Sequence, residues 1–437
     1  MSTVMDPFKR ADVPLARQVQ LNLNVRGLGQ SATLDINERS AALQAAGKTV
    51  YRLGLGQSPY PVPDCVVESL RAHAAEKDYL PVRGLRALRE SVADYHRRND
   101  GLDRGADDVL IGPGSKELMF ILQLVYYGDL VIPAPSWVSY MPQAHIAGRQ
   151  IHWIKTRRSN NWKLQAEELE EVCEQDPSRP RVLILNYPSN PTGVTYNEIE
   201  LAALARVARR YGIVLLSDEI YGELTFNGRH RTIANYYPEG TIISSGLSKW
   251  CGAGGWRIGT FLFPPELRWL QDAMAVVASE SFTSVSAPIQ HAAVLAFQQP
   301  PEVMRYLEHS RAIQGALGRH VTAELRGARL DLPDPEGGFY LFVDFSVHRE
   351  RLEARGITSG QDLCNRLLEQ SGVAILPGSA FGRSRRELSA RLALVDFDGA
   401  RALAAAAEGQ AVDDRFVEQY CWNVVEAARR IRLWLDV

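Results

Sequence analysis

Short apolar segments alternate with helical patterns from about residue 107 onwards, and this alternation constrains the fold more than any other feature. The segments have strand length and almost no polar interruptions: Asp108–Gly112, Asp129–Pro133, Arg181–Asn186, Gly212–Ser217 and Arg257–Phe263, with a further short run at Thr241–Ile243. Near-continuous apolar strands separated by helices are typical of a parallel sheet buried on both faces. The sequence therefore predicts an α/β fold with a mostly parallel sheet sandwiched by helices.

The remainder of the 437-residue chain predicts a second, smaller α+β domain. One long helical stretch, Pro265–Arg326, is expected to lead out of the large domain, which we place at residues 61–325. Residues 326–437 then form the small domain, and residues 1–60 are an N-terminal segment that partly joins it. The small domain is expected to use the segments Gly337–Phe345, Gly360–Gln370, Val373–Pro377 and Leu388–Val395, followed by a helical tail.

Composition argues against several classes of protein. A formal net charge of −2 gives no reason to expect nucleic acid or an anionic membrane as a partner. No run of about 18 apolar residues predicts a membrane span. The five cysteines contain no C-x-x-C pair, and the start of the chain lacks a secretory apolar core, so we expect a reduced, cytoplasmic protein. No His/Cys/Asp cluster has metal-ligand spacing, so no metal site is predicted.

Lys249 is the strongest candidate for chemistry. It lies in the Gly-rich segment Ser244–Gly259, directly after an apolar run, and Arg257 follows eight positions later. Most lysines are exposed, so a surface charge is the alternative. A desolvated lysine beside another cation has a lowered pKa and can form a Schiff base with a carbonyl, while Arg257 could also bind a phosphate.

Polar residues follow the ends of two other predicted strands, where ligands collect in α/β sheets. Asp218 is either a helix-capping residue or a carboxylate that keeps a ring nitrogen protonated, and Tyr221 could donate to a phenolic oxygen. Asn186–Gly193 is either a plain turn or a rigid loop that aims the amide of Asn190 at a ligand, with a cis Asn190–Pro191 bond as a hypothesis.

Three further positions have a structural and a functional interpretation. Gly112–Leu118 begins a helix, where Ser115 can cap and the free N–H groups can bind phosphate. Trp137 suits a core position and a ring-stacking position equally well. Arg391 lies within an apolar strand, where it needs either an internal salt bridge or the carboxylate of a ligand.

Together these motifs resemble the class I and II aminotransferases, the pyridoxal-phosphate-dependent enzymes of fold type I that include aspartate aminotransferase. Ser248-Lys249 with Gly255-Trp-Arg-Ile-Gly259 is similar to the lysine signature of that family. The resemblance implies an aminotransferase that moves an amino group between an α-amino acid and a 2-oxo acid by a ping-pong route. It also implies that Lys249 is catalytic and holds pyridoxal 5'-phosphate as an internal aldimine.

The resemblance assigns the other roles as follows. Asp218 pairs with the ring nitrogen, Asn190 and Tyr221 contact the phenolic oxygen, and Trp137 stacks on the ring. The phosphate is bound by Arg257, Ser248 and the backbone at Gly114, Ser115 and Lys116, with Tyr79 supplied by the neighbouring subunit of a homodimer. Arg391, Asn190 and the backbone at Gly56 bind the substrate carboxylate.

Two departures from the family pattern leave questions open. Gly246 stands where many relatives have serine, so the phosphate contact is expected to shift to Ser245 or Ser248. The chain continues for over forty residues past Val395, and this tail could add packing or form a lid. A lyase, a cyclising synthase or an oxidase on the same fold is the alternative function.

Overall fold

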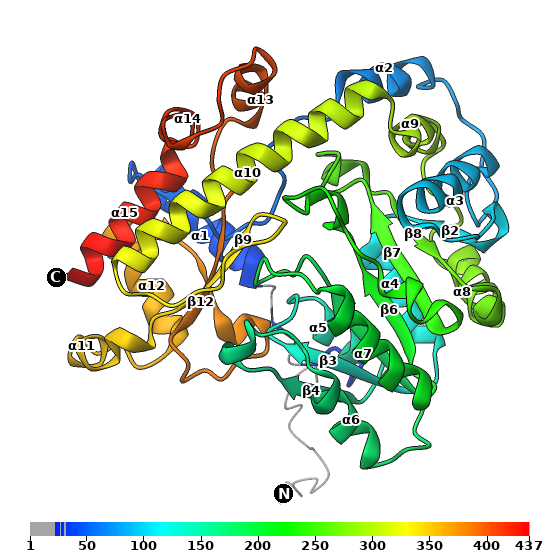
Figure 1. Ribbon diagram of the computed structural model, residues 1–437, viewed down its shortest axis with the longest axis horizontal. Helices are drawn as coiled ribbons and strands as arrows, with labels where there is room; N and C mark the ends of the chain where they lie inside the picture. Colours follow the sequence, from blue (N-terminus) through cyan, green and yellow to red (C-terminus); the bar gives the residue numbers. More distant parts are fainter. Residues whose placement is uncertain (1–21, 27, 30–31, 437) are drawn as a thin grey trace, which may run out of the picture.

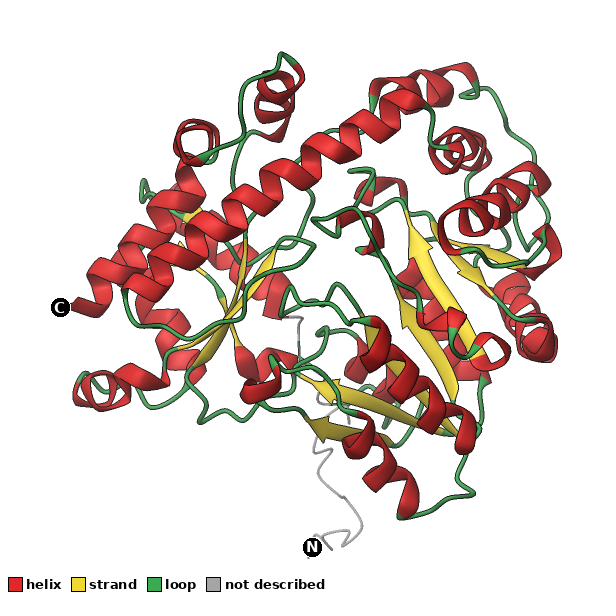
Figure 2. Ribbon diagram, in the orientation of Figure 1, coloured by secondary structure: helices red, strands yellow, loops and turns green. Residues whose placement is uncertain are grey.

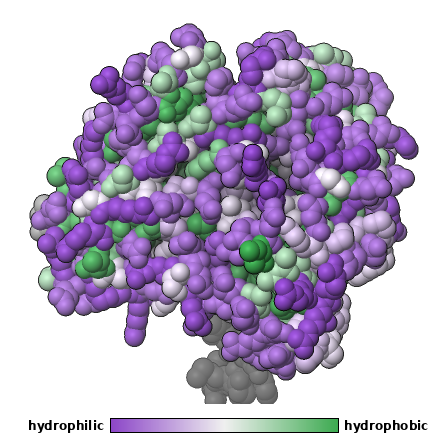
Figure 3. Space-filling view, viewed as in Figure 1, coloured by the Kyte–Doolittle hydropathy of each residue, from purple (hydrophilic) through white to green (hydrophobic). Residues whose placement is uncertain are grey.

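A computed structural model describes residues 22–26, 28–29 and 32–436 of the chain (Figure 1). The predicted N-terminal segment therefore lies partly outside the described residues. Within the described part, a large sheet flanked by helices lies beside a smaller group of strands and helices, and one long helix runs across both (Figures 1 and 2). The viewed face is mostly hydrophilic, with small separate apolar areas (Figure 3).

The large sheet has seven strands in the order β2-β8-β7-β6-β5-β3-β4. Their bounds are β2 Val109–Gly112, β3 Asp129–Ala134, β4 Ile151–Lys155, β5 Arg181–Asn186, β6 Val214–Asp218, β7 Thr241–Gly246 and β8 Gly259–Leu262. Only β8 runs antiparallel to its neighbours, so the predicted mostly parallel sheet is confirmed. The edge strand β4 was not predicted, because it is only half-buried and interrupts its apolar residues with His152.

Alternating side chains of these strands fill cores on opposite faces of the sheet, as the pleat requires. On one face, Leu216 of β6 belongs to the core formed with the helices α4 Ser115–Val125, α5 Tyr140–Ile146 and α8 Arg268–Ser281. On the other, Leu215 belongs to the core formed with α6 Ala166–Glu174 and α7 Glu198–Arg210. The helices α2 Asp64–Ala72, α3 Arg86–Asp100 and α9 Ala287–Gln298 complete the cover around β2, β7 and β8.

The predicted long helical stretch over Pro265–Arg326 is mostly helical, but it is interrupted. Three helices occupy it, namely α8, α9 and α10 Pro301–Gly327. The break before α10 falls at Gln299, which has a left-handed φ of 53°, followed by Pro300. Because proline removes a backbone donor and disfavours the helical conformation in the residue before it, the chain turns there.

The smaller group of strands contains an antiparallel sheet in the order β11-β12-β9, with bounds β9 Tyr340–Asp344, β11 Leu376–Pro377 and β12 Ser389–Ala393. The strand β1 Tyr51–Arg52 pairs with β10 Val373–Ala374, which ties the N-terminal segment to this part of the chain. The helices α1 Ala32–Ala45, α11 Arg349–Ala354 and α12 Gly360–Ser371 complete it. The long helix α10 contributes Val303 to the core around α3 and α9 and Leu317 to this one.

The tail forms three helices that pack into this core. These are α13 Gly399–Ala407, α14 Asp414–Tyr420 and α15 Trp422–Asp436, and all three contact α10. In α15, Val425, Ile431 and Trp434 are buried in the core. The described part of the tail therefore adds packing, and the lid alternative is wrong. Within residues 22–26, 28–29 and 32–436, no helix combines the length and apolar character that crossing a bilayer requires.

Candidate active site

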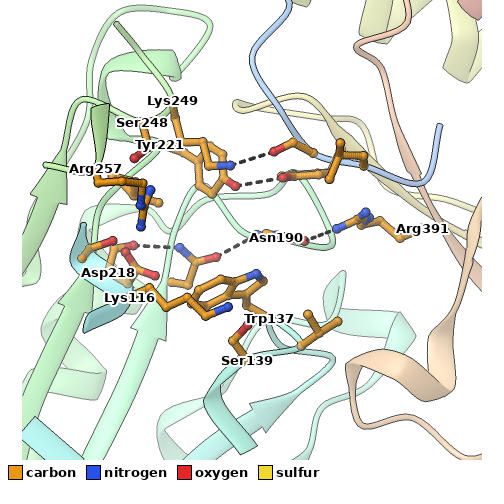
Figure 4. A pocket seen from close by; sticks show the side chains of 17 residues that line it. Lys116, Trp137, Ser139, Asn190, Asp218, Tyr221, Ser248, Lys249, Arg257 and Arg391 are labelled. Atoms are coloured by element: carbon orange, nitrogen blue, oxygen red, sulfur yellow. Dashed lines mark hydrogen bonds between the residues drawn. The ribbon is translucent and has the colours of Figure 1, made fainter. Parts of the chain in front are cut away.

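A cavity of about 380 Å³ lies where β5 and β6 end, between the large sheet and the smaller group of strands (Figure 4). Most of the residues predicted from the sequence line it: Gly56, Ser115, Lys116, Trp137, Asn190, Asp218, Tyr221, Ser248, Lys249, Arg257 and Arg391. Gly114 lies next to Arg257 without lining the cavity. Tyr79 is far more exposed, at 90%, and is not part of this cavity. The sequence motifs thus converge in space although their residues span more than 300 positions.

Lys249 follows β7 and points into the cavity. Its Nζ donates a hydrogen bond to the carbonyl of Gly56 at 2.7 Å and lies 5.7 Å from the centre of the Tyr221 ring. Burial and the cation of Arg391 lower the pKa of Lys249 from 10.5 to about 8, although the carboxylate of Asp218 opposes them. A substantial fraction of the amine is therefore neutral close to physiological pH, as a nucleophile requires.

Asp218 is the last residue of β6 and is only 3% exposed. Tyr140 donates its hydroxyl to Oδ2 at 2.5 Å, whereas Oδ1 has no partner within the described part of the chain. Burial raises the pKa of Asp218 to about 6, against the hydrogen bond from Tyr140. Buried acceptors are almost always hydrogen-bonded, so Oδ1 is suited to a donor on a bound molecule.

Arg391 lies on β12 and is 2% exposed. It donates to the Oδ1 atom of Asn190 at 3.2 Å and to the carbonyl of Gly54, while its Nε has no partner among the described residues. Its guanidinium lies 4.8 Å from the ring centre of Tyr340, and burial lowers its pKa. No carboxylate in the described chain pairs with it, so the internal salt bridge is wrong as an alternative. A buried cation without an anion is suited to a carboxylate from a ligand.

At the other end of the cavity, an anionic ligand can approach the backbone at the start of α4 closely. Ser115 and Lys116 open α4, whose free N–H groups attract anions. Gly114 has a φ of +91°, and a Cβ placed on it would lie 2.1 Å from Nη2 of Arg257. Arg257 itself has a left-handed φ of 54° and donates to the carbonyl of Gly254 at 3.0 Å. Glycine at 114 is therefore what allows the guanidinium to reach the start of α4.

The structure shows which of Ser245 and Ser248 lies closer to the candidate site. Ser248 lines this cavity, whereas Ser245 lines a different one. A side chain at Gly246 would place its Cβ 2.6 Å from the carbonyl oxygen of Ile258, so this backbone leaves no room for a serine there. Of the two serines predicted as substitutes, only Ser248 faces the candidate site.

Trp137 and Tyr221 lie on two sides of the cavity (Figure 4). The Trp137 ring is half-buried, with Nζ of Lys116 5.5 Å from its centre and Tyr140 edge-on at 5.2 Å. The hydroxyl of Tyr221 is hydrogen-bonded to that of Tyr340 at 2.9 Å. Trp137 thus borders the cavity and also packs against the core beside α4 and α5, and its stacking role stays a prediction.

Sequence reasoning did not single out Tyr140 or Tyr340 as site residues. Tyr340 belongs to the predicted segment Gly337–Phe345 and Tyr140 follows Trp137 by three positions, but the sequence does not reveal in which direction either side chain points. The cis expectation for Asn190–Pro191 is also wrong: the cis bonds of the described chain are Ala134–Pro135 and Tyr187–Pro188.

Comparison with known proteins identifies the family. Residues 48–404 match the family described as aminotransferase class I and II. The chain belongs to the class I and II aminotransferases. Aspartate aminotransferase of Geobacillus stearothermophilus is 33% identical to this chain over 373 residues, covering 83% of this chain and 92% of that protein. The aspartate/prephenate aminotransferase of Cereibacter sphaeroides is 31% identical, covering 81% and 90%.

Solved structures agree with the sequence relatives. Aspartate aminotransferase from Thermus thermophilus with maleate superposes with a TM-score of 0.81 at 27% identity, covering 95% of this chain and 99% of that one. The resemblance to fold type I is therefore confirmed, and this aminotransferase uses pyridoxal phosphate as its cofactor. The alternative of another reaction on the same fold is not favoured by the family match or by the relatives.

Proposed function

We propose that Lys249, Asp218 and Arg391 carry out amino transfer between an α-amino acid and a 2-oxo acid in the cavity of about 380 Å³. The observation that supports this most is their combination in one site. It joins an amine with a lowered pKa, a buried carboxylate oxygen without a partner, and a buried guanidinium without an anion. The cofactor and the substrate would supply the partners that Oδ1 of Asp218 and the guanidinium of Arg391 lack, and the aldehyde that the amine of Lys249 would bind.

The residues present suit pyridoxal phosphate. Oδ1 of Asp218 would accept a hydrogen bond from the protonated ring nitrogen, and Trp137 would stack on the ring. Arg257, Ser248 and the backbone at the start of α4 would bind the phosphate, and Gly114 leaves room for this. When bound, the cofactor supplies an electron sink that makes the α-hydrogen of an amino acid acidic.

The protein's own residues then position the substrate and move the proton. Arg391, with Asn190 and the backbone at Gly56, orients the substrate through its carboxylate. This would place the α-carbon near Lys249. The amine of Lys249 would hold the cofactor through its aldehyde and, in its neutral form, would take the α-proton and return it during amino transfer. Tyr221 would contact the phenolic oxygen of the cofactor.

We further propose a cytoplasmic homodimer in which Tyr79 reaches the phosphate of the partner's site. Tyr79 is 90% exposed, and its loop is joined to α8 by the Arg83–Asp272 ion pair at 2.5 Å. Trp269 and Val276 of α8 are also exposed, at 55% and 66%. Exposed aromatic and apolar side chains in one region are typical of an interface. Light scattering of the purified protein tests this, with a monomer as the contradicting result.

The test of the proposed function is an amino-acid panel on the cofactor-loaded protein, read by the visible absorbance of the bound cofactor. A productive donor is expected to shift the band, and adding a 2-oxo acid should restore it with one new amino acid formed per donor consumed. Aspartate is the first donor to try, because relatives are aspartate aminotransferases. Release of ammonia, peroxide or a cyclised product without a new amino acid would instead support the alternative reaction.

A further inference from the structure

The residue after Asp218 in the chain is a second buried carboxylate, Glu219, and both of its oxygens have hydrogen-bond partners. Glu219 is only 5% exposed and lines a separate cavity of about 250 Å³. The hydroxyls of Ser217 and Thr232 each donate to its Oε1 at 2.6 Å, and the Tyr187 hydroxyl lies 3.2 Å from the same oxygen. Ordered hydroxyls around one buried oxygen keep the carboxylate ionised and fixed in place.

The other oxygen of Glu219 is bound by His230. Nε2 of His230 lies 2.8 Å from Oε2, and the imidazole stacks on the ring of Tyr187 at 5.3 Å. Burial alone would lower the pKa of His230, but the charge and hydrogen bond of Glu219 outweigh it, and the pKa is raised above its ordinary value. Burial likewise would raise the pKa of Glu219, but His230 and the hydroxyls keep it lowered. Both shifts favour an imidazolium paired with a carboxylate, in which Nδ1 of His230 has no partner among the described residues.

This pair is joined to the active site through short covalent and hydrogen-bonded links. Glu219 follows Asp218 in the chain, and its backbone N–H donates to the carbonyl of Ser244 at 2.9 Å. Asn186, which precedes Tyr187, donates through Nδ2 to the backbone carbonyl of Asp218 at 2.8 Å. The charge of Glu219 also acts on Asp218 and favours its protonated form.

Other charged and titratable groups face the pair from every neighbouring element. They are Tyr95, His96 and Asp100 of α3, Arg104 after it, Glu223 near the end of β6, Arg229 and Arg231 beside His230, and Arg311 of α10. Most are already paired: His96 with Asp100 at 2.7 Å, Arg231 with Glu198 at 2.8 Å, and Arg311 with Glu223. His230 is therefore the group that compensates Glu219 directly.

We propose that the Glu219–His230 pair is a positioning element for Asp218: the imidazolium cancels the charge of Glu219, so that the cofactor's ring nitrogen meets one carboxylate charge rather than two. This inference rests on the proposed function, because it assumes that Asp218 faces the ring nitrogen. Neither residue lines the active-site cavity, so both act through Asp218. The pair would thereby set the pH range in which Lys249 and the ring carry the protons that amino transfer needs.

The test is a pH titration of the absorbance of the cofactor-loaded enzyme, in which the midpoint reports the proton held at the Lys249 linkage. His230→Gln keeps a hydrogen-bond donor beside Glu219 but removes the charge. At an effective dielectric constant of about 40, an uncompensated charge at a separation of about 10 Å raises a midpoint by roughly 0.5 pH units, and His230→Gln is expected to produce a shift of this order. In the double variant Glu219→Gln/His230→Gln both charges are gone, and the midpoint should return to the wild-type value.

His96→Gln is the matched control, because His96 is also a buried histidine bonded to a carboxylate but is paired with Asp100 rather than with Glu219. It is expected to shift the midpoint less than His230→Gln does.

In the cofactor-free protein, the NMR titration of His230 should have a midpoint above the ordinary value of about 6.5, and Glu219→Gln should lower it.

The outcomes separate this inference from the proposed function. A wild-type protein that shows no cofactor band, together with an ordinary NMR titration of His230, would refute both. A normal band whose midpoint is the same in wild type and His230→Gln, with only thermal stability reduced, would overturn the positioning role alone. A double variant that stays shifted would overturn the charge-cancelling explanation.

Discussion

Replacing Asp218 by asparagine is expected to stabilise the cofactor-free protein while damaging the enzyme. Burial raises the pKa of Asp218 from 3.8 to about 6, so ionising this side chain in the folded protein is unfavourable. A shift of about two pKa units corresponds to about 3 kcal/mol of folding free energy. Asparagine keeps an oxygen that can accept the hydrogen bond from Tyr140, and it places no charge in the site.

The sign of the pH dependence follows from the raised pKa. Because the folded value lies above the unfolded value, the stabilising contribution of Asp218 is complete below about pH 4 and is lost as the pH rises through about 6. The Asp218→Asn variant has no charge to form at this position, so its free energy of unfolding does not fall with rising pH for this reason. Relative to wild type, the variant should therefore gain about 3 kcal/mol between acid and pH 8, of which roughly half develops above pH 5.

Urea unfolding of both cofactor-free proteins at several pH values and one fixed protein concentration measures this difference. Asp64→Asn removes an exposed carboxylate and is the control, with no comparable trend expected. In the loaded enzyme, losing the charged partner of the ring nitrogen should reduce kcat by roughly 100-fold or more. A variant that is equally destabilised at pH 5 and at pH 8 would refute the assignment of a buried, unpaired charge.

Four further changes test other parts of the site. Arg391→Lys keeps a positive charge but loses the two parallel N–H donors of the guanidinium. The KM for the amino acid in steady-state kinetics should rise about 100-fold, while cofactor affinity is retained. Gly114→Ala places a Cβ 2.1 Å from Nη2 of Arg257, and equilibrium titration should show cofactor affinity weakened at least about tenfold. Since the pKa of Lys249 is lowered to about 8, the rate of cofactor binding should rise with pH through a midpoint near 8, as the amine loses its proton. Deleting residues 414–437 removes two helices from a core, so circular dichroism should show loss of cooperative unfolding.

Each of these has a contradicting result. An Arg391→Lys enzyme with unchanged KM would mean that the substrate carboxylate binds elsewhere. Unweakened cofactor affinity in Gly114→Ala would argue against the contact between Arg257 and the start of α4. A binding rate that is flat between pH 7 and 9 would contradict a perturbed Lys249. A truncated protein that unfolds like the full chain would show that the tail is dispensable for packing.

The parts of the fold that were predicted correctly are those where burial on both faces leaves a strong pattern. The strands β3, β5 and β6 are fully or almost fully buried, and their uninterrupted apolar residues mark them directly. The edge strand β4 was not predicted, because a strand at the edge of a sheet is less buried and its sequence is less continuously apolar. The break at Gln299–Pro300 was missed, because helical periodicity continues on both sides of it. The proposed domain boundary near residue 325 stays a prediction, since α10 contributes to cores on both sides.

Most of the candidate site could be predicted from the sequence, because strand ends carry recognisable polar residues and the lysine segment resembles a known signature. Side-chain direction could not be predicted. The contact of Tyr140 with Asp218 and that of Tyr340 with Tyr221 depend on how α5 and β9 pack against the sheet. Tyr79 stays a prediction because its role requires a second copy of the chain.

The central claim is that the amine of Lys249 holds the cofactor. Borohydride reduction of the loaded enzyme, followed by peptide mass mapping, fixes the attachment point chemically. The expected result is one pyridoxyl group per chain, on Lys249, and none in Lys249→Ala. Attachment to Lys116, the other lysine that lines the cavity, or no attachment at all, would contradict the account.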